Sequence, residues 1–150
     1  MSFLGVVSIV GVVVAVVLVV ALMRQHRRDL VGTMLEKRRA ASRLQSRAWY
    51  VEGTEEIDVA LSLTADAFYY ENPDLEASFD LDRIDEIEYA DDLATGHAVR
   101  NGCRVLRLRS HGAAFEFLLE GPDAAKWMAA LPPRTYGDAP APNLPTAHAV

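Results

Sequence analysis

An uninterrupted apolar run near the amino terminus is the feature that most constrains how this chain folds. Residues 3–23 carry no charged side chain and are rich in valine and leucine. An α-helix of that length measures about 31 Å, which matches the roughly 30 Å hydrocarbon core of a bilayer. Because lipid offers the backbone no hydrogen-bond partner, the preference of valine for strands does not apply there. The run predicts a transmembrane anchor over residues 1–23, with the lipid bilayer as the partner of residues 3–23.

Two alternatives to an anchor are a cleaved signal peptide and a buried core helix. A signal peptide begins with positive charge, has a shorter apolar run and ends in small residues at a cleavage site. Here the start is uncharged, the run is long, and it ends in Ala21-Leu22-Met23-Arg24. The comparison favours a retained anchor.

Basic residues follow the apolar run directly. Residues 24–47 hold eight Lys and Arg against two Asp and Glu, with apolar residues at helical spacing. We expect a basic juxtamembrane helix over 24–48 that places six residues at the membrane surface: Arg24, Arg27, Arg28, Lys37, Arg38 and Arg39. By the positive-inside rule, the amino terminus lies outside and the rest is cytoplasmic, at the inner (plasma) membrane. Two interpretations stay open: this helix lies on anionic lipid, or it stands as a solvated stalk.

From Trp49 onward the apolar period changes from helical to two, which is typical of strands. Six short segments show it: 57–63, 67–71, 77–81, 84–89, 103–109 and 113–119. Their connections are too short for crossover helices, so we expect an antiparallel sheet. Pro122 and Asp123 favour the start of a last helix that Pro132 ends, and the Ala/Pro-rich residues 132–150 are predicted to be a disordered tail.

The predicted fold class is therefore α+β. An N-terminal transmembrane helix continues into a basic amphipathic helix. A small antiparallel sheet in the form of a partly closed barrel follows over residues 49–131, and one carboxyl-terminal helix caps it.

Residues 49–131 resemble the bacterial pleckstrin-homology-like (PH-like) and GRAM-like domains. The resemblance lies in the segments VALSLTADAFYYEN, ASFDLDRIDEIEY and CRVLRLRSHGAAFEF, and in the final helix PDAAKWMAALP with its Trp127. The usual family layout has seven strands, whereas the sequence predicts six. The resemblance implies a platform that binds lipids, peptides or proteins.

The charge of residues 49–131 decides among those ligands. The segment contains 18 Asp and Glu against 6 Lys and Arg, a net charge of −12. Head-group binding in PH domains uses basic residues in the loop after the first strand, and the loop expected there, Thr64-Ala65-Asp66, has none. Because a field of this sign repels phosphates, we expect the domain to bind neither lipid head groups nor nucleic acid.

An acidic run offers a surface for a basic protein partner. The residues that we assign to this acidic surface are Asp80, Asp82, Asp85, Glu86 and Glu88. The alternative is a merely solvated strand face. A calcium site is disfavoured because the spacing lacks the EF-hand pattern.

No residue pattern identifies a reaction. His97, Cys103 and His111 lack the closely spaced ligand pairs of a zinc site, and no nucleophile with a base is visible. The single cysteine excludes an intrachain disulfide. We therefore expect no enzyme activity, no metal and no cofactor.

The sequence thus predicts a single-pass, membrane-anchored PH-like binding or scaffold module in the cytoplasm, with an acidic surface for an unidentified protein partner. The alternative function is a structural subunit of a membrane complex, assembled through the transmembrane and juxtamembrane helices.

Overall fold

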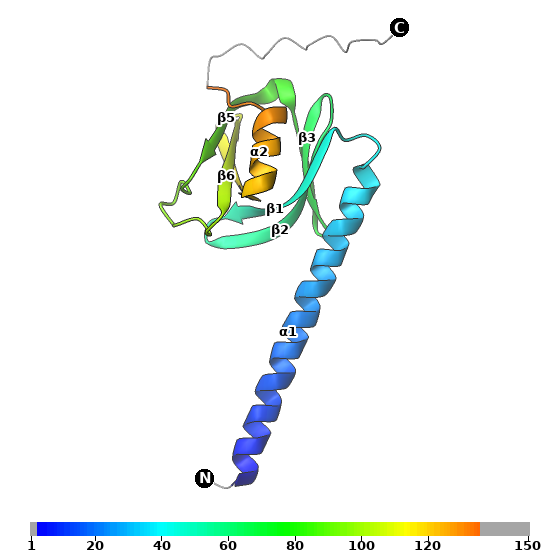
Figure 1. Cartoon of the computed structure of the whole chain (residues 1–150), viewed down its shortest axis with the longest axis vertical. Coiled ribbons are helices and arrows are strands. Elements are labelled where there is room, and N and C mark those ends of the chain that lie inside the picture. The colour runs from blue at the N-terminus through cyan, green and yellow to red at the C-terminus, as the bar shows by residue number, and fades with distance from the viewer. Residues whose placement is uncertain (1–2, 136–150) are drawn as a thin grey trace.

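The computed structural model describes residues 3–135 (Figure 1). The side chains of residues 3–12 and of Arg24, Arg27 and Arg28 lie outside the described part. Two α-helices, one 3-10 helix and seven strands follow one another as α1 (Phe3–Arg38), β1 (Leu44–Glu52), β2 (Glu55–Leu63), β3 (Ala67–Asn72), β4 (Leu75–Asp80), η1 (Leu81–Arg83), β5 (Ile84–Ala90), β6 (Cys103–Ser110), β7 (Ala113–Glu120) and α2 (Gly121–Ala130).

The amino-terminal part of the fold differs from the prediction. One continuous helix of 36 residues, α1, replaces a transmembrane helix followed by a basic helix that reaches residue 48. In the described part of the chain, no helix combines the length and the apolar character that a membrane crossing needs. The predicted fold class is wrong in this respect. The carboxyl-terminal part of α1 is fixed by the sheet instead, since Val31 is only 2% exposed and the helix packs on β2 and β3.

Strand β1 is the second correction, because its first residues were assigned to the basic helix. It begins at Leu44 and pairs along its whole length with β2. Ser46 and Ala48 point into the domain and are buried, whereas Arg47 between them is exposed. The sheet therefore has seven strands rather than six.

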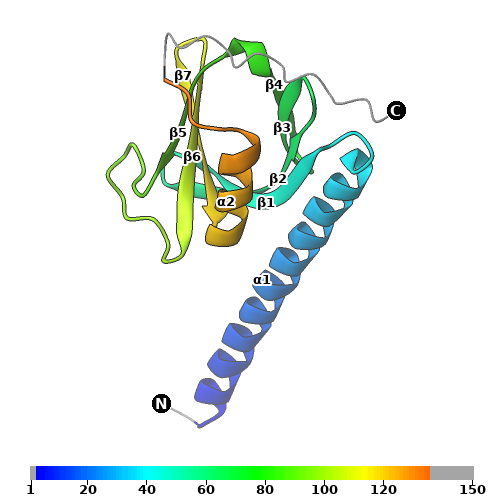
Figure 2. The ribbon, with the colours of Figure 1, turned by 45° about the horizontal axis from the view of Figure 1, so that its top comes forward.

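All strand pairs are antiparallel, as the short connections predict. The order across the sheet is β4-β3-β2-β1-β7-β6-β5, so β1 joins the first four strands to the last three. Strands β4 and β5 form the two edges of the described sheet. Figure 2 shows that the sheet curls around α2, whereas α1 extends away from it.

Helix α2 closes the concave side of the curled sheet. Its Trp127 is fully buried, lies edge-on to Phe68 at 5.4 Å between ring centroids, and donates its ring N–H to the Ser46 hydroxyl at 2.7 Å. Burying a side chain of this size contributes roughly 1.5–3 kcal/mol from its apolar area alone. The hydrogen bond satisfies its polar atom, so the ring anchors α2 in the core.

Candidate functional site

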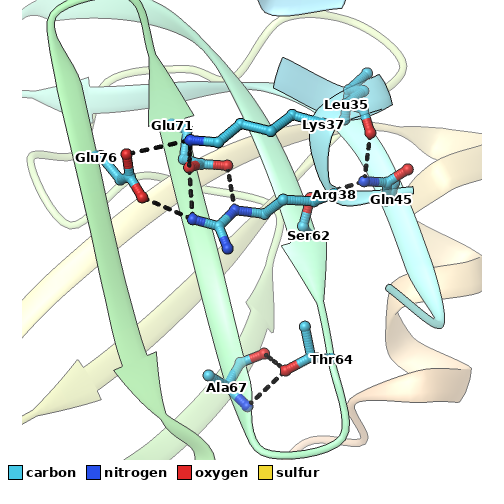
Figure 3. A network of polar contacts seen from close by, with 9 residues as sticks. All are labelled: Leu35, Lys37, Arg38, Gln45, Ser62, Thr64, Ala67, Glu71 and Glu76. Carbon is cyan, nitrogen blue, oxygen red and sulfur yellow. Dashed lines mark hydrogen bonds and ion pairs between the residues drawn. The ribbon is translucent and has the colours of Figure 1, made fainter. Parts of the chain in front are cut away.

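A polar network joins the end of α1 to the sheet (Figure 3). The Arg38 guanidinium binds both carboxylate oxygens of Glu71, at 2.6 and 2.7 Å, and reaches Glu76 at 2.8 Å. It also lies over the Tyr69 ring, 3.8 Å from the centroid. Glu71 is 1% exposed, and its hydrogen bond to Arg38 raises the pKa of that guanidinium above its ordinary value. A buried carboxylate with a two-point cationic partner holds the helix end in one position.

A second contact strengthens the same junction. The Gln45 amide donates to the Leu35 carbonyl at 2.8 Å and to the Ser62 hydroxyl at 3.0 Å. These bonds connect the last turns of α1, strand β1 and strand β2, as Figure 3 shows. The junction therefore fixes the direction in which α1 leaves the domain.

The residues predicted to lie at the membrane surface meet protein carboxylates where their side chains are described. Lys37 lies 3.5 Å from Glu76, Arg38 binds Glu71, and Arg39 binds Glu36 within α1 at 3.0 Å. Contact with anionic lipid stays a prediction for these residues. The side chains of the other three, Arg24, Arg27 and Arg28, lie outside the described part.

The acidic surface forms one continuous stretch from the end of β4 through η1 into β5. Three of its carboxylates meet arginines: Asp80 meets Arg83 at 3.3 Å, Glu86 meets Arg109 at 3.2 Å, and Glu88 meets Arg107 at 2.6 Å. The Asp85 carboxylate accepts the His111 backbone N–H at 3.0 Å, and Asp82 is exposed. The Asp80–Arg83 pair is open to water on both sides and contributes only about 0–1 kcal/mol, whereas Arg107, the partner of Glu88, is only 15% exposed. Asp82 and the half-exposed Glu88 carboxylate remain accessible to a partner.

Arg107 and Arg109, which alternate with leucines in β6, bind carboxylates of the neighbouring strands. Arg107 is the most enclosed, since it meets Glu88 and also Glu116, which is 7% exposed, at 2.8 Å. Burial lowers the pKa of Arg107, but the hydrogen bonds to Glu116 and Glu88 outweigh this and the pKa is raised overall. Glu116 also accepts the Ala94 N–H at 2.9 Å, so this pair holds the loop over residues 91–102 against the sheet.

The loop after the first strand differs from the one named in the sequence analysis. It is the tight turn at Gly53 between β1 and β2, and Thr64-Ala65-Asp66 instead connects β2 to β3. Gly53 has φ +62°, a conformation that glycine adopts without strain. Glu52 and Glu55 lie directly opposite each other beside it, so the corrected loop is also acidic.

His97, Cys103 and His111 do not form a metal-binding cluster in the described part of the chain. Within residues 3–135, no three His, Cys, Asp or Glu side chains gather in a way that would hold a metal ion. Burial raises the pKa of the Cys103 thiol, which disfavours the reactive thiolate. His111 takes a left-handed conformation, φ 50°, in the β6–β7 turn.

Sequence reasoning missed the contact of the segment after α2 with the free edge of β5. Arg134 and Ile87 form an antiparallel bridge there. Arg134 falls in the range 132–150 that was predicted to be disordered, and residues 136–150 of that tail lie outside the described part. The two consecutive prolines, Pro132 and Pro133, were the available signal, because proline does not continue a helix and favours an extended chain.

Comparison with known proteins gives little further guidance. No family model matches the chain, and no curated protein matches it. Among solved structures, it is similar to the crystal structure of the C-terminal domain of an unknown protein from Leishmania infantum. The two share 11% identity over 66% of this chain and 92% of that one, with a TM-score of 0.49.

Proposed function

We propose that residues 44–135 form a PH-like, non-catalytic binding module that presents its acidic surface to a basic protein partner. The excess of carboxylates carries this proposal. Residues 49–131 contain six cationic side chains against 18 carboxylates, so internal pairing leaves most of the negative charge unbalanced. Complementary charge speeds association with a basic surface and disfavours acidic competitors.

The sheet layout supports the PH-like part of the proposal. Seven antiparallel strands and one carboxyl-terminal helix match the number of elements in that family's usual layout. The tight turn after β1 has Glu52 and Glu55 on either side of it and no basic residue. A phosphate head group is repelled there.

The exposure of its carboxylates supports the acidic surface as the place where the partner binds. Asp82 and Glu88 are exposed, and Asp85 lies between them in the same stretch. A basic partner can reach Asp82 and Glu88 directly, because both are exposed and β5 is an edge strand of the described sheet.

Neutralising this surface tests the proposal. The test variant carries Asp82→Asn, Asp85→Asn and Glu88→Gln in the full chain. A matched control carries Glu52→Gln, Glu55→Gln and Asp74→Asn, which remove the same charge from two turns elsewhere. A partner that copurifies stoichiometrically with the native chain and with the control, but is lost from the test variant, supports the proposal. Equal loss from both variants contradicts the assigned surface.

The location at the inner membrane also stays a proposal. The apolar side chains from Val13 to Met23 include nine large ones that are 44–66% exposed. Apolar surface of that extent is rare on soluble monomers and needs an apolar neighbour. Fractionation of native cells tests the location: recovery of the chain in the soluble fraction alone contradicts it.

A further inference from the structure

Strand β5 pairs with β6 on one side, and a short piece of the same chain lies along its other side, which we call the free edge of β5. We call residues 131–135 the C-terminal segment. In Figure 1 it leaves α2 and turns back toward β5. The Ile87 N–H donates to the Arg134 carbonyl at 2.8 Å, and the Arg134 N–H donates to the Ile87 carbonyl at 2.9 Å. This reciprocal pair is the hydrogen-bonded unit of an antiparallel ladder, so the segment lies on the edge as a rudimentary extra strand.

The Arg134 side chain adds a cationic contact to this pairing. Its Nη2 donates to the Leu81 carbonyl at 3.2 Å and also to the Ile84 carbonyl. Leu81 is the first residue of η1 and Ile84 the first residue of β5, and Asp82 and Asp85 directly follow them in the sequence. Carbonyl oxygens next to carboxylates create a negative potential that suits a guanidinium.

The inner end of the segment is held by its apolar residue. Leu131 is 6% exposed, and its carbonyl accepts the Tyr89 hydroxyl at 2.8 Å. The segment therefore has an apolar anchor, one backbone bridge and one guanidinium contact. These three features define what the edge recognises.

The resident strand pairs poorly because of its sequence. In an antiparallel ladder with Ile87 opposite Arg134, Tyr89 lies opposite Pro132. Proline has no N–H to donate to the Tyr89 carbonyl. A strand with another residue in place of Pro132 makes one additional edge hydrogen bond, which contributes about 0.5–1.5 kcal/mol.

We propose that the basic partner docks as an extended strand on the free edge of β5, and that the C-terminal segment occupies this edge in the absence of the partner. The partner segment carries an arginine opposite Ile87 and a backbone N–H group opposite Tyr89, where this chain has Pro132. This rests on the proposed function and names its partner class and its regulation. The tethered segment competes with every partner, so only a better-paired basic strand displaces it.

The test compares the native full chain with the Arg134→Pro variant, which loses both the backbone donor and the guanidinium. Arg83→Ala is the matched control, since it removes an exposed arginine from η1 and leaves the edge intact. All chains are kept in mild detergent because of their exposed apolar helix. The probe is a synthetic peptide of residues 129–135 in which both prolines are alanine, with an Arg134→Glu peptide as its control.

Two measurements test separately whether the C-terminal segment occupies the edge and whether the edge binds a basic strand. Amide hydrogen exchange at Ile87 reports on the resident segment, and we expect it to be at least about tenfold faster in Arg134→Pro than in Arg83→Ala, because a detached segment no longer holds the carbonyl of residue 134 against the Ile87 N–H. Peptide titration reports on the edge, and we expect the arginine peptide to bind Arg134→Pro at least about tenfold more tightly than the native chain, since no competitor remains. The glutamate peptide is expected not to bind.

Different outcomes contradict different parts of the proposal. Unchanged exchange at Ile87, or equal affinity of the peptide for the native chain and Arg134→Pro, contradicts self-occupation of the edge and leaves the acidic-surface function standing. Equal binding of the arginine and glutamate peptides contradicts recognition of a basic strand, and with it the proposed function.

Discussion

The junction between α1 and the sheet makes a sharp prediction about stability. Arg38→Ala leaves the Glu71 carboxylate, which is 1% exposed, with only the Lys37 ammonium at 4.0 Å. Removing one partner of a buried ion pair costs about 3–5 kcal/mol, because the remaining charge has lost its solvation and its partner. Glu76→Ala instead removes a contact of a carboxylate that is 61% exposed, and we expect a loss of about 0–1 kcal/mol.

Thermal and urea unfolding of the full chain, followed by tryptophan fluorescence, measures the difference. For a domain of this size, 1 kcal/mol corresponds to about 4 °C in the midpoint, so Arg38→Ala is expected to lower it by roughly 12–20 °C. The double variant Arg38→Met with Glu71→Leu removes both charges and is expected to recover most of that loss. Equal shifts for Arg38→Ala and Glu76→Ala, or a double variant no more stable than Arg38→Ala, would refute the reasoning.

Three further expectations concern the core and the titratable groups. Trp127→Phe takes the ring donor from the buried Ser46 hydroxyl and is expected to cost about 1–2 kcal/mol in urea unfolding, with no loss contradicting the bond. Arg107→Ala leaves Glu116 without its cation, so we expect a loss of roughly 2–4 kcal/mol and faster amide exchange over residues 91–102; unchanged exchange there would contradict the tether. Burial raises the pKa of Tyr89, so the stability it provides is complete below pH about 10 and is lost as the pH rises through the higher folded value. Tyr89→Phe is expected to flatten the decline of the thermal midpoint above pH 10, and an unchanged slope would contradict this.

Much of the sheet was predictable from local alternation. Strands β2 to β7 match the six segments of period two, because large apolar residues alternate there with polar ones. Strand β1 was not predicted, because its buried positions include Ser46 and Ala48, which are small or polar. Ser46 is buried because Trp127 bonds it from 81 residues away, and no local pattern encodes such a partner.

The ion pairs of the candidate site were predictable only where they are local. Arg107 and Arg109 alternate with Leu106 and Leu108, a pattern typical of cross-strand partners in neighbouring strands. Arg38 and Glu71 are 33 residues apart, and their pairing depends on where α1 ends and docks. That end was misjudged, because apolar residues at helical spacing were taken to continue the helix to residue 48, whereas α1 ends at Arg38 and the chain pairs with β2 from Leu44 onward.

The contact of Arg134 with β5 could not be predicted from the sequence. Composition indicated a disordered tail, since proline-rich segments bury little apolar surface. The bridge forms because β5 is an edge strand with free backbone groups, a property of the assembled sheet and not of the tail.

Carboxyl-to-amine cross-linking in native extracts, followed by mass spectrometry, tests the central claim most directly. The zero-length reagent joins a carboxylate to a lysine that touches it, so it reports contact with a basic partner at the acidic surface. We predict cross-links from Asp82, Asp85 and Glu88 to lysines of one second protein. Cross-links to a partner that map only to the β1–β2 and β3–β4 turns, with none from these three residues, would contradict the account.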